Sequence, residues 1–295
     1  MKTKYLLFAL SLFAIACSDN NKRSDAYGNF EAKEIIVSAE AQGKILDLKI
    51  EEGQALSANE IIGLIDTVQL SLKKEQLIAQ KNVISTKISS ILSQIDIQEE
   101  QKKTLLIEKE RIEKLLKDNA ATTQQLDNIN GKLNVLESQI KSIRTQNSTV
   151  LNELEVLSKQ VDQLEDQLKK CTLVNPIKGT VLEKYVEPYE IAVMGRSLYK
   201  IADLSEMELR IYISGEQLPH IKIGQAVQVM VDEDDKKNKN LEGTISWISQ
   251  QAEFTPKIIQ TKEERVNLVY AVKVRVKNDG TLKIGMPGEV LFSSK

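Results

Sequence analysis

The sequence predicts an elongated, multi-domain α+β chain, with a long antiparallel α-helical coiled-coil hairpin inserted into a split β domain and a small β-barrel after it. Three observations support this prediction. Residues 67–171 hold a heptad pattern, the segments on either side of them resemble each other, and residues after 203 alternate between apolar and polar. Such an arrangement is typical of a part of a larger assembly and not of an active site.

The first sixteen residues, 1–16, have the features of a signal peptide. Lys2 and Lys4 precede a short apolar run, residues 5–15, which is too short to remain as a membrane-spanning helix. Small residues then lead to Cys17, as in the lipobox of bacterial lipoproteins, where the chain is cut and the cysteine receives acyl chains. We therefore expect Cys17 to be acylated. An ordinary secretory signal with an incidental cysteine is the alternative.

Residues 17–30 are expected to form a flexible tether. The run from Ser18 to Asp25 is entirely polar, as the linkers of lipid-anchored domains usually are. Several acyl chains on Cys17 would give a stable membrane anchor.

Two segments, 31–66 and 172–203, are similar to each other. Gly43 and Asp66 lie 23 residues apart in the first segment, and Gly179 and Asp203 lie 24 apart in the second. Apolar residues alternate between turns that contain glycine or proline, which indicates short strands. Neither half has enough strands to bury a face alone, so we expect the two halves to combine into one flattened barrel.

Residues 67–171 are predicted to form the hairpin. In its second arm, positions three and four residues apart are apolar over about seven heptads, so they share one stripe of a coiled-coil helix. The stripe comprises Leu126, Ile129, Leu133, Leu136, Ile140, Ile143, Asn147, Val150, Leu154, Leu157, Val161, Leu164, Leu168 and Cys171. The first arm repeats the pattern less regularly, with Gln98 among its stripe positions. The short link 117–123 makes the arms antiparallel neighbours, each roughly 70 Å long.

Three residues of the hairpin carry specific expectations. Thr122 or Thr123 can N-cap the second arm. Asn147 is the one polar residue of the stripe, and such a residue usually fixes the register at some cost in stability. Cys171 ends the stripe, so we expect it to be buried, and with Cys17 acylated no internal disulfide is expected.

Residues 204–295 are predicted to form the β-barrel domain. Apolar residues alternate with other residues around 207–213, 227–231 and 272–276, and turn residues separate these stretches. Short strands with regular turns are typical of a small barrel.

The composition argues against several functional classes. The 40 Lys and Arg residues balance 42 Asp and Glu residues, unlike the basic surface of a nucleic-acid-binding protein. His220 is the only histidine, which supports neither a catalytic triad nor a zinc site. No glycine-rich phosphate loop precedes a helix. We therefore expect no catalytic residue, no cofactor, no metal site and no nucleic-acid partner.

The order half domain, hairpin, half domain, barrel is similar to that of the HlyD family of periplasmic adaptor proteins, also called membrane fusion proteins. Similar segments begin at Asn175 (NPIKGTV), Glu253 (EFTPK) and Ile284 (IGMPGE). The resemblance implies that the split β domain is lipoyl-like. It also implies an adaptor that links an inner-membrane transporter to an outer-membrane channel for efflux or secretion, as a homo-hexamer. The expected location is the periplasm of a Gram-negative bacterium, lipid-anchored to the inner membrane.

Hairpins of this family carry a tip motif of arginine, three residues, leucine, six residues and serine. Arg111 and Leu115 match the first two positions, and Thr122 keeps a hydroxyl at the third. The resemblance implies that these residues meet the outer-membrane channel. The alternative from the residues alone is that Leu115 belongs to the coil, Arg111 is solvated and Thr122 is an N-cap.

The type of transporter and the alternative functions complete these expectations. The chain ends soon after Gly288, without the membrane-proximal domain of many adaptors of proton-driven pumps, and the segment from Val269 (VYAVKV) is similar to adaptors of ABC exporters. An ABC-type transporter is therefore favoured. The alternatives are a structural coiled-coil envelope lipoprotein, or a lipoyl or biotinyl carrier domain that has lost the lysine-bearing turn after Asp66.

Overall fold

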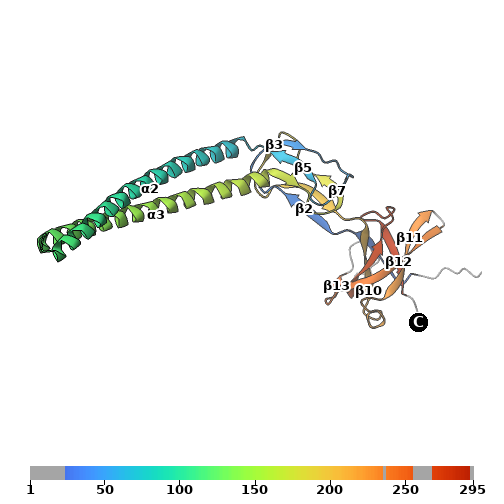
Figure 1. Ribbon diagram of the computed structural model, residues 1–295. Coiled ribbons are helices and arrows are strands. Elements are labelled where there is room, and N and C mark those ends of the chain that lie inside the picture. Colours follow the sequence, from blue (N-terminus) through green and yellow to red (C-terminus); the bar gives the residue numbers. More distant parts are fainter. Residues whose placement is uncertain (1–23, 235–236, 255–267, 293–295) are drawn as a thin grey trace, which may run out of the picture.

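The computed structural model describes residues 24–234, 237–254 and 268–292; the signal peptide and Cys17 lie outside the described residues. A long helical hairpin forms one end, a two-sheet β domain lies in the middle, and a β-barrel forms the other end (Figure 1). The predicted fold class is therefore confirmed. The elements are β1 (Ala26–Glu31), β2 (Glu34–Ser38), β3 (Gly43–Leu48), β4 (Ala55–Leu56), β5 (Ile61–Ile65), α2 (Val68–Lys117), α3 (Thr123–Cys171), β6 (Thr172–Val174), β7 (Gly179–Lys184), β8 (Ile191–Ala192), β9 (Ser197–Ala202), β10 (Glu206–Ser214), η1 (Leu218–His220), β11 (Ala226–Asp234), β12 (Lys237–Ile248), β13 (Glu253–Phe254), β14 (Leu268–Lys277) and β15 (Pro287–Leu291).

The hairpin is held together along the predicted stripe. All fourteen stripe positions of α3 are buried or half-buried, while most residues between them are exposed. Polar contacts cross the edge of this seam: Lys74 to Glu165 (2.7 Å), Lys81 to Ser158 (3.0 Å) and Lys102 to Glu137 (2.6 Å). Each contact joins an α2 residue to an α3 residue in antiparallel order. The apolar seam therefore supplies the packing, and the pairs beside it match the register.

Two polar side chains interrupt the seam near the same level. Ile91, Ile95 and Val150 form a buried cluster, and Ile143 packs against it. Gln98 follows Ile95 by one turn, and Asn147 follows Ile143 by one turn. The side-chain oxygens of Gln98 and Asn147 are both buried and accept no hydrogen bond. A buried polar atom without a partner costs stability, so this is a weak point of the hairpin.

Both sheets of the middle domain contain strands from both halves of the sequence. The strand orders are β2-β9-β7-β4 and β6-β5-β3-β8, and all pairings are antiparallel. The halves are related by an approximate two-fold repeat: Gly53 N donates to Val181 O (2.8 Å), and Tyr189 N donates to Ile45 O (2.7 Å). Gly53 and Tyr189 thus occupy equivalent turns, and both have a left-handed backbone, with φ of 84° and 74°.

The barrel is a closed ring of six strands. Their order is β10-β1-β15-β11-β12-β14, and β14 also pairs with β10, which closes the ring; β13 adds to the free side of β14. The inward residues form one apolar core that includes Phe30, Leu209, Val229, Val274 and Val290. Closure leaves these six strands without an open sheet edge.

The strand β1 corrects the predicted tether. Residues 26–30 were expected to be flexible, but Ala26–Glu31 pair with β10 on one side and β15 on the other. Ala26 and Phe30 point inward and are almost completely buried in the barrel core. The tether prediction is wrong for these residues because their alternating apolar side chains fill one place in the six-strand ring. The chain therefore starts in the barrel, leaves it and returns after β9.

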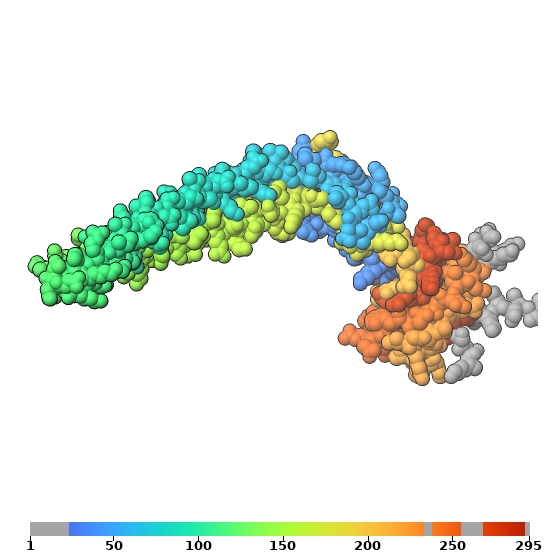
Figure 2. All heavy atoms as spheres, viewed as in Figure 1, coloured from blue at the N-terminus to red at the C-terminus, as the bar shows by residue number. Residues whose placement is uncertain are grey.

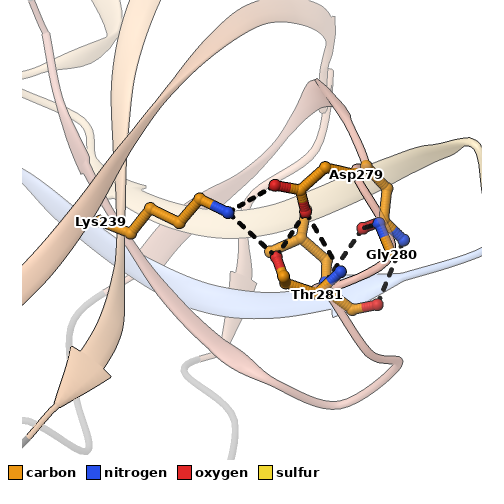
Figure 3. A network of polar contacts seen from close by, with 6 residues as sticks. Lys239, Asp279, Gly280 and Thr281 are labelled. Atoms are coloured by element: carbon orange, nitrogen blue, oxygen red, sulfur yellow. Dashed lines mark hydrogen bonds and ion pairs between the residues drawn. The ribbon is translucent and has the colours of Figure 1, made fainter.

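A polar network fixes the barrel turn after β14 (Figure 3). Lys239 on β12 donates to Asp279 (2.5 Å) and lies 3.3 Å from the hydroxyl of Thr281. Asp279 also accepts the backbone N–H of Thr281 (3.1 Å). These hydrogen bonds, led by that from Lys239, hold the pKa of the Asp279 carboxyl well below its ordinary value.

Candidate partner-binding site at the hairpin tip

The tip of the hairpin is a tight, hydrogen-bonded turn. After α2 ends at Lys117, Asn119 takes a left-handed backbone with φ of 53°, which asparagine tolerates better than most residues. Ala120 N then donates to Leu115 O (2.8 Å), so the link folds back over the last turn of α2. The tip is therefore a defined surface and not a loose loop.

Thr122 is the N-cap of α3, as the sequence predicted. Its hydroxyl accepts the backbone N–H of Gln125 (3.3 Å), and the Gln125 side chain accepts the backbone N–H of Thr122 (2.8 Å). This reciprocal pair is a capping box, which satisfies two backbone donors at the helix start. Gln125 was not singled out from the sequence, although a glutamine three residues after a threonine is the signal for this motif.

Arg111 and Leu115 lie one helical turn apart on α2, so they share a face close to the tip. The side chain of Leu115 is 40% exposed, and Arg111 is also exposed. Nearby charges are paired, with Lys114 on Glu110 (2.8 Å) and Lys109 near Glu113 (3.9 Å). By contrast, no ion pair joins Arg111 to any residue that the structure describes. The Arg111 guanidinium is therefore available to a partner.

The structure brings two of the three predicted tip residues onto one face and gives the third a structural task. Arg111 and Leu115 present a cation beside an apolar side chain. The Thr122 hydroxyl already accepts the capping hydrogen bond, so any contact with a partner would use its methyl group or remaining hydroxyl capacity.

Nothing among the described residues suggests chemistry at the tip or elsewhere. They contain no cluster of three or more His, Cys, Asp or Glu residues placed to hold a metal ion. His220 is exposed at the end of η1, in the barrel. The turn after Asp66, where a carrier domain would bear its lysine, is the start of α2, with Val68 N donating to Asp66 (2.9 Å).

Comparisons with known proteins match this architecture. Residues 203–292 match the family described as LcnD-like, C-terminal domain. UPF0194 membrane proteins of Citrobacter koseri and Yersinia enterocolitica are 26% and 25% identical to the chain; the matches cover 91% and 90% of this chain and 88% of each relative. The crystal structure of MacA from Actinobacillus actinomycetemcomitans shares the fold, with a TM-score of 0.56 and 21% identity over 90% of this chain and 76% of MacA.

The chain is a periplasmic adaptor, or membrane fusion, protein. Within the described ranges of the adaptor, no helix combines the length and apolar character that crossing a membrane requires. Proteins of this class oligomerise and work with membrane transporters and channels. The hairpin tip of the adaptor is thus the first place to look for a partner contact.

Proposed function

We propose that the adaptor links an inner-membrane transporter to an outer-membrane exit channel, as a ring of six copies, for efflux or secretion. The observation that carries this proposal is the exposed tip. A hairpin of two arms of 50 and 49 residues extends roughly 70 Å from the middle domain and ends in an unpaired arginine beside an exposed leucine. Arginine beside apolar surface is a frequent energetic centre of a protein interface.

The opposite end of the adaptor is proposed to lie at the inner membrane. Cys17 precedes Ala26, the first residue of β1, by nine residues, which can span at most about 30 Å. Acyl chains on Cys17 would therefore hold the barrel close to the membrane surface. We favour an ABC-type transporter over a proton-driven pump, because the barrel strand β14 is similar to that of ABC-linked adaptors.

Reversing the charge of Arg111 tests the contact with the channel. Arg111→Asp changes an exposed, unpaired side chain, so the helical circular dichroism signal and the melting temperature should stay as in the wild type. We expect cross-linking of the tip to the outer-membrane channel, and export, to be lost. Lys132→Asp, the same charge reversal at an exposed position of α3, is the control and should leave both intact. Normal export by Arg111→Asp would refute the tip contact.

Thr122 can be assigned to capping or to partner contact with one substitution. Aspartate is as good an N-cap as threonine, so Thr122→Asp should keep the hairpin stable. If Thr122 also meets the channel, this variant folds but loses export. If Thr122 is only a cap, Thr122→Asp exports normally, while Thr122→Ala loses about 1 kcal/mol of hairpin stability.

The anchor is tested by mass spectrometry of the mature N-terminus. We expect diacylglycerol and acyl groups on Cys17, and release of Cys17→Ser from the membrane or its failure to be processed. A mature chain that begins elsewhere, or an unmodified Cys17, would refute the anchor. A purely structural envelope lipoprotein, the remaining alternative, predicts that deleting the chain leaves export unchanged.

A further inference from the structure

The two sheets of the middle domain present different outer faces. On the sheet β2-β9-β7-β4, Lys200 lies 3.3 Å from Glu34 and 3.4 Å from Glu183, and these contacts, led by the hydrogen bond to Glu34, raise the pKa of Lys200 to about 12. This face is charged and internally paired. The sheet β6-β5-β3-β8 instead carries large apolar side chains outward. We call them the apolar face: Leu46, Ile61, Leu64, Val174 and Ile191, each more than a third exposed.

The apolar face is continuous across all four strands. Ile61 pairs with Val174 across β5 and β6, Leu64 pairs with Asp47 beside Leu46 across β5 and β3, and Ile191 pairs with Lys44 across β8 and β3. Monomeric proteins seldom expose contiguous apolar patches of more than a few hundred Å². A whole sheet face of this kind is typical of a surface that is covered in the working assembly.

Tyr189 stands at one edge of this face in an unfavourable conformation. It occupies the left-handed position of the turn before β8, where the equivalent turn has Gly53. Its ring is 71% exposed and lies over the ammonium group of Lys44, 5.0 Å from the ring centre. A left-handed tyrosine costs free energy that glycine would not. Neither packing nor burial repays that cost in the isolated chain.

We propose that a second copy of the adaptor docks on the apolar face, with Tyr189 as its anchor. The inference rests on the proposed function, which assigns the two ends of the molecule to the channel and the transporter. The apolar face lies between those ends, in the middle domain, and the hairpin and barrel leave that domain in different directions (Figures 1 and 2). A side surface of a bridging rod is left to neighbouring copies. An apolar patch with an exposed tyrosine at its edge also matches the composition of protein interfaces.

Site-specific cross-linking in cells tests this placement. Ile191→Cys and Ile223→Cys offer a matched pair, because both isoleucines are 64% exposed, one on the apolar face and one on a barrel turn. The buried Cys171 does not compete for a maleimide-benzophenone label. The labelled chain is co-expressed with a differently tagged copy. We expect illumination to give an adduct that carries both tags from position 191 and not from position 223.

Tyr189→Gly separates a role in docking from a role in folding. Glycine relieves the backbone, so the melting temperature should stay the same or rise, while the yield of the two-tag adduct from position 191 should fall about tenfold or more. An unchanged yield overturns the role of Tyr189. Adducts from position 191 that lack a second copy, or equal yields from 191 and 223, overturn the docking face.

The same cells distinguish this inference from the proposed function. A label at Arg111→Lys, introduced through an amine-reactive cross-linker, or at Leu115→Cys, reports contact with the channel. Channel adducts without two-tag adducts refute the docking face alone. Two-tag adducts without channel adducts refute the proposed tip contact alone.

Discussion

The hydroxyl of Tyr199 donates a 2.9 Å hydrogen bond to the side-chain oxygen of Asn175, and both residues are fully buried in the middle domain. The Asn175 amide nitrogen in turn donates to the carbonyls of Ser57 (2.7 Å) and Ile177 (2.5 Å). Ser57 belongs to the first half of the domain, and Tyr199 and Asn175 belong to the second. The network therefore joins segments that the whole hairpin separates in sequence. Burial raises the pKa of Tyr199 well above its ordinary value, which keeps the hydroxyl a donor.

Removing that hydroxyl should destabilise the middle domain. Tyr199→Phe leaves the Asn175 oxygen buried without a partner, so we expect a loss of about 1–3 kcal/mol. Denaturant-dependent labelling of the buried Cys171 thiol, which lies in the same core, reports unfolding of this domain. Tyr185→Phe is the control, since its hydroxyl bonds the exposed Glu183 (3.0 Å) and its loss should cost little. Equal effects of the two substitutions would contradict this assignment.

A charge in the seam should unfold the hairpin, whereas the same charge one residue away should not. Leu136 is 6% exposed and Val135 is 59% exposed. Leu136→Asp buries an unpaired carboxylate and should cost about 3 kcal/mol or more, and Val135→Asp should cost under about 0.5 kcal/mol. Thermal melting followed by helical circular dichroism measures both. A destabilising Val135→Asp would mean that this side of α3 is covered in solution.

Apolar substitution of the polar seam residues should stabilise the hairpin. Asn147→Leu removes a buried oxygen that accepts no hydrogen bond, and we expect a gain of about 1–2 kcal/mol and a higher melting temperature. Gln98→Leu should act in the same direction for the same reason. Gln146→Leu, at an exposed position beside Asn147, is the control with little expected change. A lower melting temperature for Asn147→Leu would show that its amide finds a partner in solution.

The Lys239–Asp279 contact predicts a specific response to pH. The folded pKa of Asp279 lies below its ordinary value of 3.8, so its ion pair stabilises the turn at pH values above about 4 and is lost as the pH falls further. Lys239→Gln should move the carboxyl pKa up toward 3.8, as followed by ¹³C NMR of the side chain. Lys283→Gln, which removes an exposed lysine outside this network, should leave the titration unchanged. An unmoved midpoint in Lys239→Gln would show that Thr281 alone sets the pKa.

Periodicity predicted the hairpin in detail because its energetics are local. The fourteen stripe positions of α3 and the cap at Thr122 depend on neighbours three to seven residues away, which a single sequence displays directly. The equivalence of Gly53 and Tyr189 was also visible, because the internal repeat aligns their turns. The polar pair Gln98 and Asn147 was placed in the stripe, but its missing hydrogen bonds required coordinates.

Long-range pairing explains what the sequence could not predict. β1 directly follows a polar run and pairs with β10 and β15, whose residues lie about 180 and 260 positions later, so no local pattern marks it as part of the barrel. The apolar face was hidden for a related reason. β5 has apolar residues on both sides, such as Ile61 and Ile62, and only the packed sheets show which side faces outward.

The early position of β1 makes the chain a set of nested closures, like brackets within brackets. The hairpin closes through neighbouring residues, the middle domain closes around it, and the barrel closes last, where Phe292 N donates to Asp25 (2.7 Å). Loop-closure entropy favours this order, since each inner closure shortens the effective distance that the next must bridge. The barrel therefore remains open until β15 has been made, and a chain secreted as it is synthesised spends that interval with β1 unpaired. Because β1 lies next to the lipid-bearing end, an adaptor truncated before β15 would stay at the membrane with an exposed strand edge, the form most prone to aggregation.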